Sequence, residues 1–147
     1  NESFYIWVFL YWLLGRVSVR REVLLWLAQA ESDLRKAMND LRTEDWDSAA
    51  FWSQQAAEKS LKALLISGGK IYRGHELLEL ARFIETELRI DPENIRDDLR
   101  ELTIHYTISR YPNAANALPS DLYTKDKAEE LVQKAKRVLE WVKQNLQ

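Results

Sequence analysis

The sequence is short of several residue types that define common classes of protein. It contains no cysteine, only four glycines and three prolines among 147 residues, and only two histidines, His75 and His105. The lack of cysteine excludes disulfides and zinc sites built on thiolates, and a cytoplasmic location is expected. Because glycine and proline are the main breakers of helices, their scarcity favours long helices.

Several functional signatures are missing as well. The sequence has no glycine-rich phosphate loop, no His-Glu-x-x-His motif, no EF-hand loop and no cysteine nucleophile. Its two histidines lie far apart along the chain, which makes them weak candidates for metal ligands. We therefore expect neither a metal site nor a cofactor.

Charge is nearly balanced, with 21 basic and 23 acidic residues and a net charge of −2. A protein that binds nucleic acid over a broad surface is usually strongly basic. Any contact with RNA must therefore be local. The length is sufficient for one domain with one hydrophobic core.

Eleven apolar residues follow one another from Phe4 to Leu14. A membrane-spanning helix needs about 20 such residues. A secretory signal places its basic residues before the apolar run, whereas Arg16, Arg20 and Arg21 follow this one. We expect residues 1–19 to be an extension that makes an oligomer or packing contact, and no membrane association. A remnant of a longer hydrophobic segment, or upstream sequence read from a misplaced start codon, are the alternatives.

Beyond this run, apolar residues recur at steps of three and four, which predicts helices, and no segment alternates as a strand does. The predicted helices cover about 20–43, about 46–67, a segment opened by Gly74-His75, a segment from Pro92 to just before Pro112, and a last segment from Ser120 or Asp121. Residues 111–121 are expected to form a loop. The fold class is therefore all-α: an antiparallel up-and-down bundle of four to five helices over residues 20–147, with an extra N-terminal apolar helix.

The most suggestive polar pattern is Arg100-x-x-x-x-His105. Histidine exchanges a proton near neutral pH, and arginine holds a phosphate in a bidentate fork. Together they suit metal-free cleavage of an RNA phosphodiester. On a straight helix five steps rotate by about 140°, so a single chain makes a poor pair. Two subunits at a symmetric interface could bring both side chains to one cleft. The alternative is a surface ion pair between Glu101 and His105.

A second group consists of candidates for nucleotide or phosphate binding. Its members are Lys59, Tyr106, Arg110 and Tyr111. The alternative for Arg110 and Tyr111 is a helix end, where an arginine offsets the negative end of the helix. Glu58 and Lys62 have the spacing of a surface ion pair, and His75 is expected only to fix the turn before its helix.

Four stretches, taken together, resemble the HEPN domain family (higher eukaryotes and prokaryotes nucleotide-binding). They are "AAFWSQQAAEKSLKALLISGG", "GHELLELARFI", "HYTISRYPNA" and "YTKDKAEELVQKAKRVLEWV". The resemblance implies a helical bundle that forms homodimers and is paired with a small nucleotidyltransferase encoded beside it. It also implies that a toxin-type ribonuclease of this family would use an arginine and histidine spaced as Arg100 and His105 are.

Three hypotheses for function follow. The first is the metal-independent ribonuclease, or toxin component, of a toxin–antitoxin pair whose antitoxin is a small nucleotidyltransferase. The second is a non-catalytic nucleotide-binding or adaptor subunit for that nucleotidyltransferase. The third is a structural homodimer without a ligand. The position of His105 separates them, because a histidine buried in its own core does not fit the first.

Overall fold

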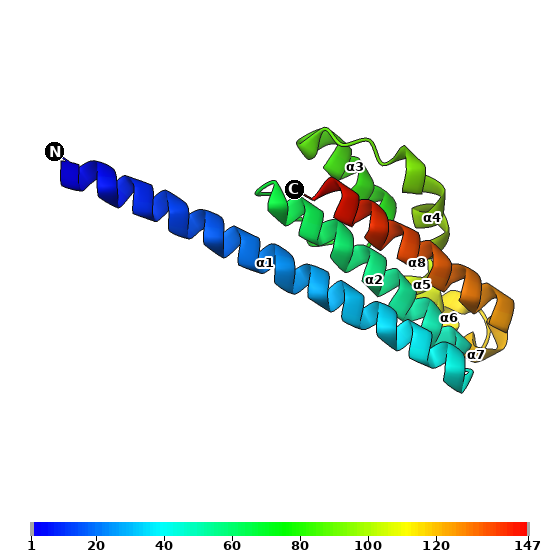
Figure 1. The fold of residues 1–147 in the computed structure, drawn as a ribbon. Coiled ribbons are helices and arrows are strands. Elements are labelled where there is room, and N and C mark those ends of the chain that lie inside the picture. Colours follow the sequence, from blue (N-terminus) through cyan, green and yellow to red (C-terminus); the bar gives the residue numbers. More distant parts are fainter. Residues whose placement is uncertain (1, 147) are drawn as a thin grey trace.

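The computed structural model describes residues 2–146, and the described chain is helical without any strand. Its order is α1 (Glu2–Thr43), α2 (Trp46–Ser67), α3 (Leu77–Leu88), α4 (Glu93–Thr103), α5 (His105–Ile108), α6 (Pro112–Ala115), α7 (Pro119–Leu122) and α8 (Lys125–Asn145). Figure 1 shows the longer helices packed as a bundle, with one end of α1 extending well beyond it. The predicted all-α class is confirmed.

The apolar N-terminal run and the predicted helix at 20–43 form one continuous helix, α1, of 42 residues. Gly15 does not interrupt it. The first buried position in α1 is Val23, so every described residue before it is outside the core. The free end of α1 in Figure 1 is therefore the apolar run itself, exposed on all sides. Among residues 2–146, no helix combines the length and the apolar character that crossing a membrane requires.

α2 is the central helix of the bundle. Thr43 and Asp45 hydrogen-bond through their side chains at 2.6 Å in the tight turn that leads from α1 into α2. Most of α2 is buried, and many of its buried residues are small, which lets neighbouring helices come close. The buried small residues of α2 are Ala49, Ala50, Ser53, Ala56, Ala57, Ser60 and Ala63. α1 and α8 both pack against α2, and α3 and α4 close the other side.

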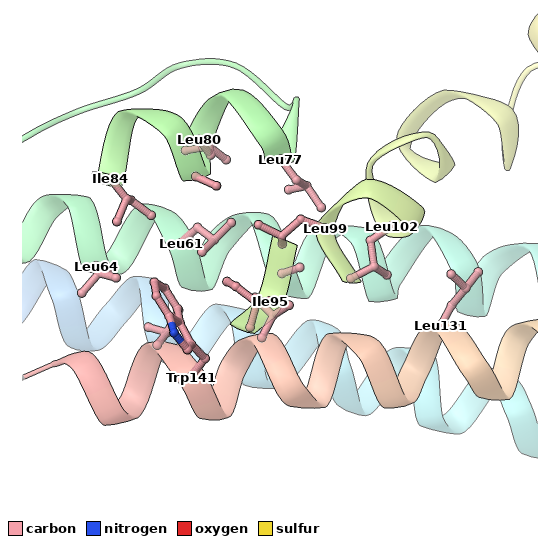
Figure 2. Packing of buried hydrophobic residues seen from close by; sticks show 14 of the residues in the cluster. Leu61, Leu64, Leu77, Leu80, Ile84, Ile95, Leu99, Leu102, Leu131 and Trp141 are labelled. Atoms are coloured by element: carbon pink, nitrogen blue, oxygen red, sulfur yellow. The ribbon is translucent and has the colours of Figure 1, made fainter. Parts of the chain in front are cut away.

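The main core lies between α2, α3, α4 and α8. Figure 2 shows leucine and isoleucine side chains from these helices meeting around Leu61 and Leu99. Trp141 of α8 packs into the same cluster and is 7% exposed. This packing determines which side of α2 faces the core. The candidate site lies on another side of the same helix.

Residues 69–76 form a non-helical segment between α2 and α3. Gly69 begins it with φ of +75°, a conformation that favours glycine. Figure 2 shows the segment running past α3 before that helix begins at Leu77. The predicted start at Gly74-His75 was therefore too early. Glu76 caps α3 instead, since its carboxylate accepts a hydrogen bond of 2.6 Å from the backbone N–H of Glu79.

The fourth helix is shorter than predicted, because α4 ends at Thr103 and the chain turns at Ile104 before the single turn of α5. The predicted loop at 111–121 contains two further single turns, α6 and α7, each with proline in its first turn. The last helix begins at Lys125 rather than at Ser120 or Asp121. Thr124 caps it by accepting a hydrogen bond of 3.2 Å from the N–H of Lys127.

Candidate functional site

Arg100 and His105 lie in different elements and different environments. Arg100 is exposed on α4, where it forms an ion pair of 2.5 Å with Asp97. His105 is in α5, is only 5% exposed, and contacts Tyr123 of its own core. Within one chain, the structure therefore does not bring the two side chains together. The expected surface pair of Glu101 with His105 is also absent from the described contacts, since Glu101 pairs with Lys127 and Lys134.

Burial controls the protonation of His105. Loss of hydration, aided by the positive charge of Lys127, lowers the pKa of His105 to about 4. Burial raises the pKa of the Tyr123 hydroxyl to about 12. Near neutral pH both groups are uncharged, and their 2.6 Å hydrogen bond joins a neutral imidazole to a neutral phenol. Among the described residues, no group bonds the buried Nε2 of His105. In the single chain, His105 is a core residue, which does not fit RNA cleavage by Arg100 and His105 of one chain.

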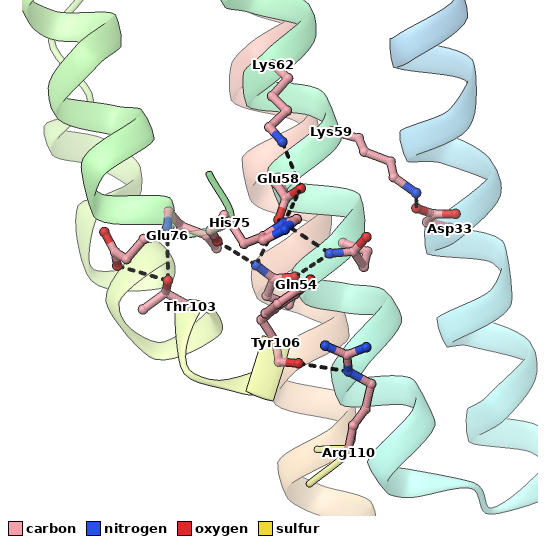
Figure 3. Close-up of polar contacts among 12 residues, drawn as sticks. Asp33, Gln54, Glu58, Lys59, Lys62, His75, Glu76, Thr103, Tyr106 and Arg110 are labelled. Atoms are coloured by element: carbon pink, nitrogen blue, oxygen red, sulfur yellow. Dashed lines mark hydrogen bonds and ion pairs between the residues drawn. The ribbon is translucent and has the colours of Figure 1, made fainter. Parts of the chain in front are cut away.

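The other histidine is more exposed and is paired with a carboxylate. The Nδ1 atom of His75 lies 3.0 Å and 3.1 Å from the two carboxylate oxygens of Glu58. The His75 side chain is 48% exposed, whereas that of Glu58 is 4% exposed. The backbone carbonyl of His75 accepts a hydrogen bond of 3.0 Å from the Gln54 side chain. Two residues of α2 thus hold His75, which comes from the segment between α2 and α3 (Figure 3).

Tyr106 connects this histidine to Arg110. The rings of His75 and Tyr106 are stacked, with centroids 4.1 Å apart and an angle of 12° between their planes. The guanidinium carbon of Arg110 lies 4.5 Å from the centre of the same tyrosine ring and 4.4 Å from that of Phe51. The Arg110 Nε–H donates to the backbone carbonyl of Tyr106 at 2.9 Å. We call the five residues Gln54, Glu58, His75, Tyr106 and Arg110 the His75–Arg110 cluster.

Arg110 differs from the other basic residues near the site because it has no acidic partner within the described chain. It is exposed and contacts three aromatic rings, including that of Tyr111 at 4.9 Å. A guanidinium that is stacked on aromatic rings remains free to form bidentate hydrogen bonds with a phosphate. The predicted nucleotide-binding residues Tyr106, Arg110 and Tyr111 therefore lie together.

Lys59, the fourth predicted nucleotide-binding residue, points away from them. Its ammonium lies 2.5 Å from the carboxylate of Asp33 on α1, and Asp33 is completely buried. Figure 3 shows this pair bridging α2 and α1, apart from the His75–Arg110 cluster. The charge of Lys59 is therefore used to neutralise Asp33, which favours a structural role over phosphate binding.

Sequence reasoning missed the pairing of Glu58 with His75. The Glu58–Lys62 ion pair that it predicted is present at 3.1 Å, but it is buried rather than on the surface. Lys62 bonds only one oxygen of the buried Glu58 carboxylate. The other oxygen can accept further hydrogen bonds, so a second donor is expected there. The sequence alone could not identify His75 as that donor. His75 lies in the non-helical segment after α2, and periodicity does not predict the path of such a segment.

The chemistry available at the His75–Arg110 cluster is proton transfer and anion binding. No group of three or more metal-ligating side chains occurs among residues 2–146. An accessible histidine, a buried carboxylate on its other nitrogen and an arginine without an acidic partner are the elements of general acid–base catalysis at a phosphate ester.

The family of this fold follows from comparison with known proteins. The family model of the HEPN domain matches residues 23–145, and the chain belongs to this family. Its relatives include "Putative toxin MJ1304" of Methanocaldococcus jannaschii, which is 33% identical over 128 residues, covering 81% of this chain and 84% of the relative. The match to the family model begins after the apolar run, so residues 2–22 are outside the family pattern.

Solved structures agree with this assignment. TT1696 from Thermus thermophilus superposes with a TM-score of 0.78 at 34% identity, covering 84% of this chain and 98% of that one. ST0689, an archaeal HEPN homologue, superposes with a TM-score of 0.72 at 36% identity, covering 85% of this chain and 98% of that one. TM0613, a HEPN domain protein from Thermotoga maritima, superposes with a TM-score of 0.65 at 28% identity, covering 81% of this chain and 94% of that one.

Proposed function

We propose that this protein is the toxin-type component of a pair whose other component is a small nucleotidyltransferase, and that it binds RNA at the His75–Arg110 cluster. The observation that carries the RNA-binding part is Arg110. It is an exposed guanidinium with aromatic contacts and no acidic partner among residues 2–146. Membership of the HEPN family and the likeness to a protein named as a toxin support the pairing.

The physical case for RNA rests on two kinds of contact. Arginine binds phosphate through two parallel charge-assisted hydrogen bonds, and unpaired bases stack on aromatic rings and on guanidinium planes. Tyr111 is 47% exposed beside Arg110, so it offers a ring for stacking. Since the whole chain carries a net charge of −2, such a local site is the kind of RNA contact that its charge allows.

The test is binding of a fluorescently labelled single-stranded RNA, measured by anisotropy. Arg110→Ala should weaken binding about tenfold, which corresponds to about 1.4 kcal/mol. Arg100→Ala is the matched control, because Arg100 is also exposed but already paired with Asp97. Equal affinity of Arg110→Ala and the wild type would overturn the proposed site.

The partner is tested separately. We expect a small nucleotidyltransferase to be encoded beside this gene and to co-purify with the tagged chain in a fixed ratio when both are expressed. Failure of the two proteins to associate would overturn the pairing but leave the RNA-binding site in place.

A second candidate is metal-independent RNA cleavage by Arg100 and His105 from two copies of the chain in a homodimer. The exposure of Arg100 favours it, since a second copy can reach this side chain. It requires His105 to leave its contact with Tyr123. Mixing Arg100→Ala and His105→Gln proteins should restore cleavage if two chains share the site, and analytical ultracentrifugation should show a dimer.

A further inference from the structure

We infer that the exposed N-terminal part of α1, residues 2–19, is a docking surface for the same segment of a second copy of this chain, in antiparallel orientation. A two-fold axis at Phe9 relates the two copies, so that Glu2 of each lies beside the partner's Arg16. The inference is independent of the proposed RNA binding, because residues 2–19 lie before the first buried position of α1 and outside the match to the family model.

The apolar surface on this part of α1 is comparable in size to a specific protein interface. Figure 1 shows the helix projecting away from the bundle, and each side chain from Phe4 to Leu14 is at least 41% exposed. Six of these eleven residues are aromatic. Since an aromatic side chain has about 150–250 Å² of surface, the run exposes on the order of 1,000 Å². A specific interface buries about 800 Å² on each partner, so the run exposes enough apolar surface to hold a partner.

One stripe of this surface continues the stripe of α1 that packs on the bundle. Three buried residues of α1 recur at steps of seven, namely Val23, Ala30 and Ala37. The same step taken toward the N-terminus reaches Arg16, Phe9 and Glu2. Seven residues make nearly two turns of an α-helix and drift by about 20°, so these three residues lie nearly on one line. A repeat of seven is the pattern by which helices pack side by side.

Side chains of this stripe already contact one another along the helix. The rings of Phe9 and Trp12 have centroids 6.2 Å apart, and the guanidinium carbon of Arg16 lies 4.7 Å from the centre of the Trp12 ring. A guanidinium that is stacked on a ring can still donate two hydrogen bonds to a carboxylate. The stripe therefore combines apolar surface with a cation that is held in place at one end.

The charges at the two ends of the apolar run favour the antiparallel orientation. Glu2 precedes the run and Arg16 follows it, and about 21 Å of helix separates them, so they cannot pair within one chain. In a parallel pair each charge would face its own kind. In an antiparallel pair centred on Phe9, positions equally far from Phe9 face one another, and Glu2 and Arg16 are each seven residues away. Such exposed ion pairs add little affinity, but they determine orientation and register.

The free part of α1 has room for this pairing. Arg16 is seven residues before Val23, the first buried residue of α1, which corresponds to about 10 Å of helix. The partner's Glu2, opposite Arg16, therefore lies about 10 Å short of the bundle. The paired segments are thus clear of both bundles, which lie at opposite ends of the pair and keep the His75–Arg110 cluster of each copy uncovered.

Disulfide cross-linking tests the register, and the absence of cysteine from the chain makes each introduced thiol the only one. Phe9→Cys places a thiol on the two-fold axis, so this variant should form a disulfide-linked dimer on mild oxidation. Tyr5→Cys and Leu13→Cys should each give little dimer alone but a cross-linked pair when mixed, because they lie four residues on either side of Phe9. Tyr11→Cys is the control, since its side chain is 83% exposed and two helix steps, about 200°, from Phe9.

Sedimentation equilibrium tests the charges. Glu2→Arg and Arg16→Glu should each raise the dissociation constant of the pair about tenfold, because both symmetric ion pairs become repulsive. The double variant restores two attractive pairs with their signs exchanged, so its dissociation constant should return close to that of the wild type. A double variant that associates as weakly as the single variants would contradict the antiparallel register.

Other occupants of this surface give different results. Equal cross-linking of Phe9→Cys and Tyr11→Cys would overturn the inference, since it would show association that does not use the stripe. The same conclusion would follow if neither Phe9→Cys nor the mixture of Tyr5→Cys and Leu13→Cys gave a dimer. A chain that is monomeric in buffer but floats with phosphatidylglycerol vesicles would assign the run to a lipid surface instead. Wild-type RNA affinity in Glu2→Arg is expected whether or not the copies pair, so the proposed function is tested separately.

Discussion

The hydroxyl of Tyr123 lies 2.6 Å from Nδ1 of His105, and this hydrogen bond joins α5 to the end of α7. Both side chains are buried, at 5% exposure for His105 and 6% for Tyr123. The contact joins the first and last of the short helical turns that lie between α4 and α8. It also makes His105 a group whose protonation opposes folding, because a charged imidazole would lose its hydration there.

The stability of the protein should therefore fall in mild acid in a way that depends on His105. The pKa of His105 is about 4 in the folded state, against an ordinary value of 6.5 for histidine. Between these pH values the unfolded chain binds more protons, so the free energy of unfolding rises with pH and falls as the pH is lowered. The loss should be about 3 kcal/mol at most and complete below pH 4.

His105→Gln removes this titration. Urea unfolding at pH 7 and at pH 4.5 should show that the variant loses less stability between the two conditions than the wild type does. Tyr123→Phe is the control, because it removes the hydrogen bond but keeps the buried histidine and hence the acid sensitivity. The same pH dependence in wild type and His105→Gln would contradict the burial of His105.

The Asp33–Lys59 pair predicts a second effect on stability. Asp33 has no exposed surface, and the Lys59 side chain is 19% exposed. Removing the charge of Lys59 leaves Asp33 with a hydrogen bond of 2.9 Å from the Gln29 side chain and with Lys36 at 3.4 Å as its remaining cation. Lys59→Met should lower the free energy of unfolding by about 3 kcal/mol, as expected when one member of a buried pair is lost.

Lys36→Met is the matched variant, since Lys36 also approaches Asp33 and the ring of Trp52. Its side chain is 44% exposed, so the change should cost less than about 1 kcal/mol. Equal losses in the two variants, measured by urea unfolding, would mean that Asp33 does not depend on Lys59. Unchanged RNA affinity in folded Lys59→Met would support the structural role of this lysine.

The small residues of α2 predict a third effect. Ala56 is fully buried against Ala30 and Leu139, from α1 and α8. Ala56→Leu should force these helices apart and cost about 1–3 kcal/mol. Ala114→Leu adds the same side chain at an exposed position and should leave the thermal midpoint nearly unchanged. A small effect of Ala56→Leu would show that the helices are not in close contact.

The apolar end of α1 predicts a fourth result. Since no described residue before Val23 is buried, removal of residues 2–21 should leave the unfolding midpoint unchanged. The exposed apolar surface should, in contrast, cause self-association, because such a surface is driven out of water. Sedimentation of the truncated chain and of the chain that retains these residues should show a smaller species after truncation. A lower unfolding midpoint would mean that this segment packs on the bundle.

Helix positions could be predicted from the sequence where local signals are strong. The bounds of α2 were predicted at about 46–67, because the two glycines at 68 and 69 end an unbroken apolar pattern. The turn at Ile104 has no such signal. There, Thr103 accepts a hydrogen bond from the Leu77 N–H and donates one to Glu76, each at 2.9 Å. This tertiary contact joins the end of α4 to the start of α3, and it is absent from any local pattern.

The candidate site was predictable only in part for the same reason. Tyr106 and Arg110 are four residues apart, so a helical turn brings them together and the sequence could suggest them. Glu58 and His75 meet across a change of chain direction, which helical periodicity does not describe. The separation of Arg100 from His105 within one chain was expected from the rotation of a helix, whereas the turn at Ile104 between them was not predicted.

The non-helical segment at 69–76 places His75 by its length. A helix advances about 1.5 Å per residue, so the ten residues from Glu58 to Gly68 carry the chain about 15 Å away from the site. An extended chain advances about 3.3 Å per residue, so the seven steps from Gly68 to His75 span about 23 Å at most and are long enough to return it. A segment shortened by several residues could not bring His75 back to Glu58. Segment length is thus as much a part of the site as its side chains, although no residue within 69–74 belongs to the His75–Arg110 cluster.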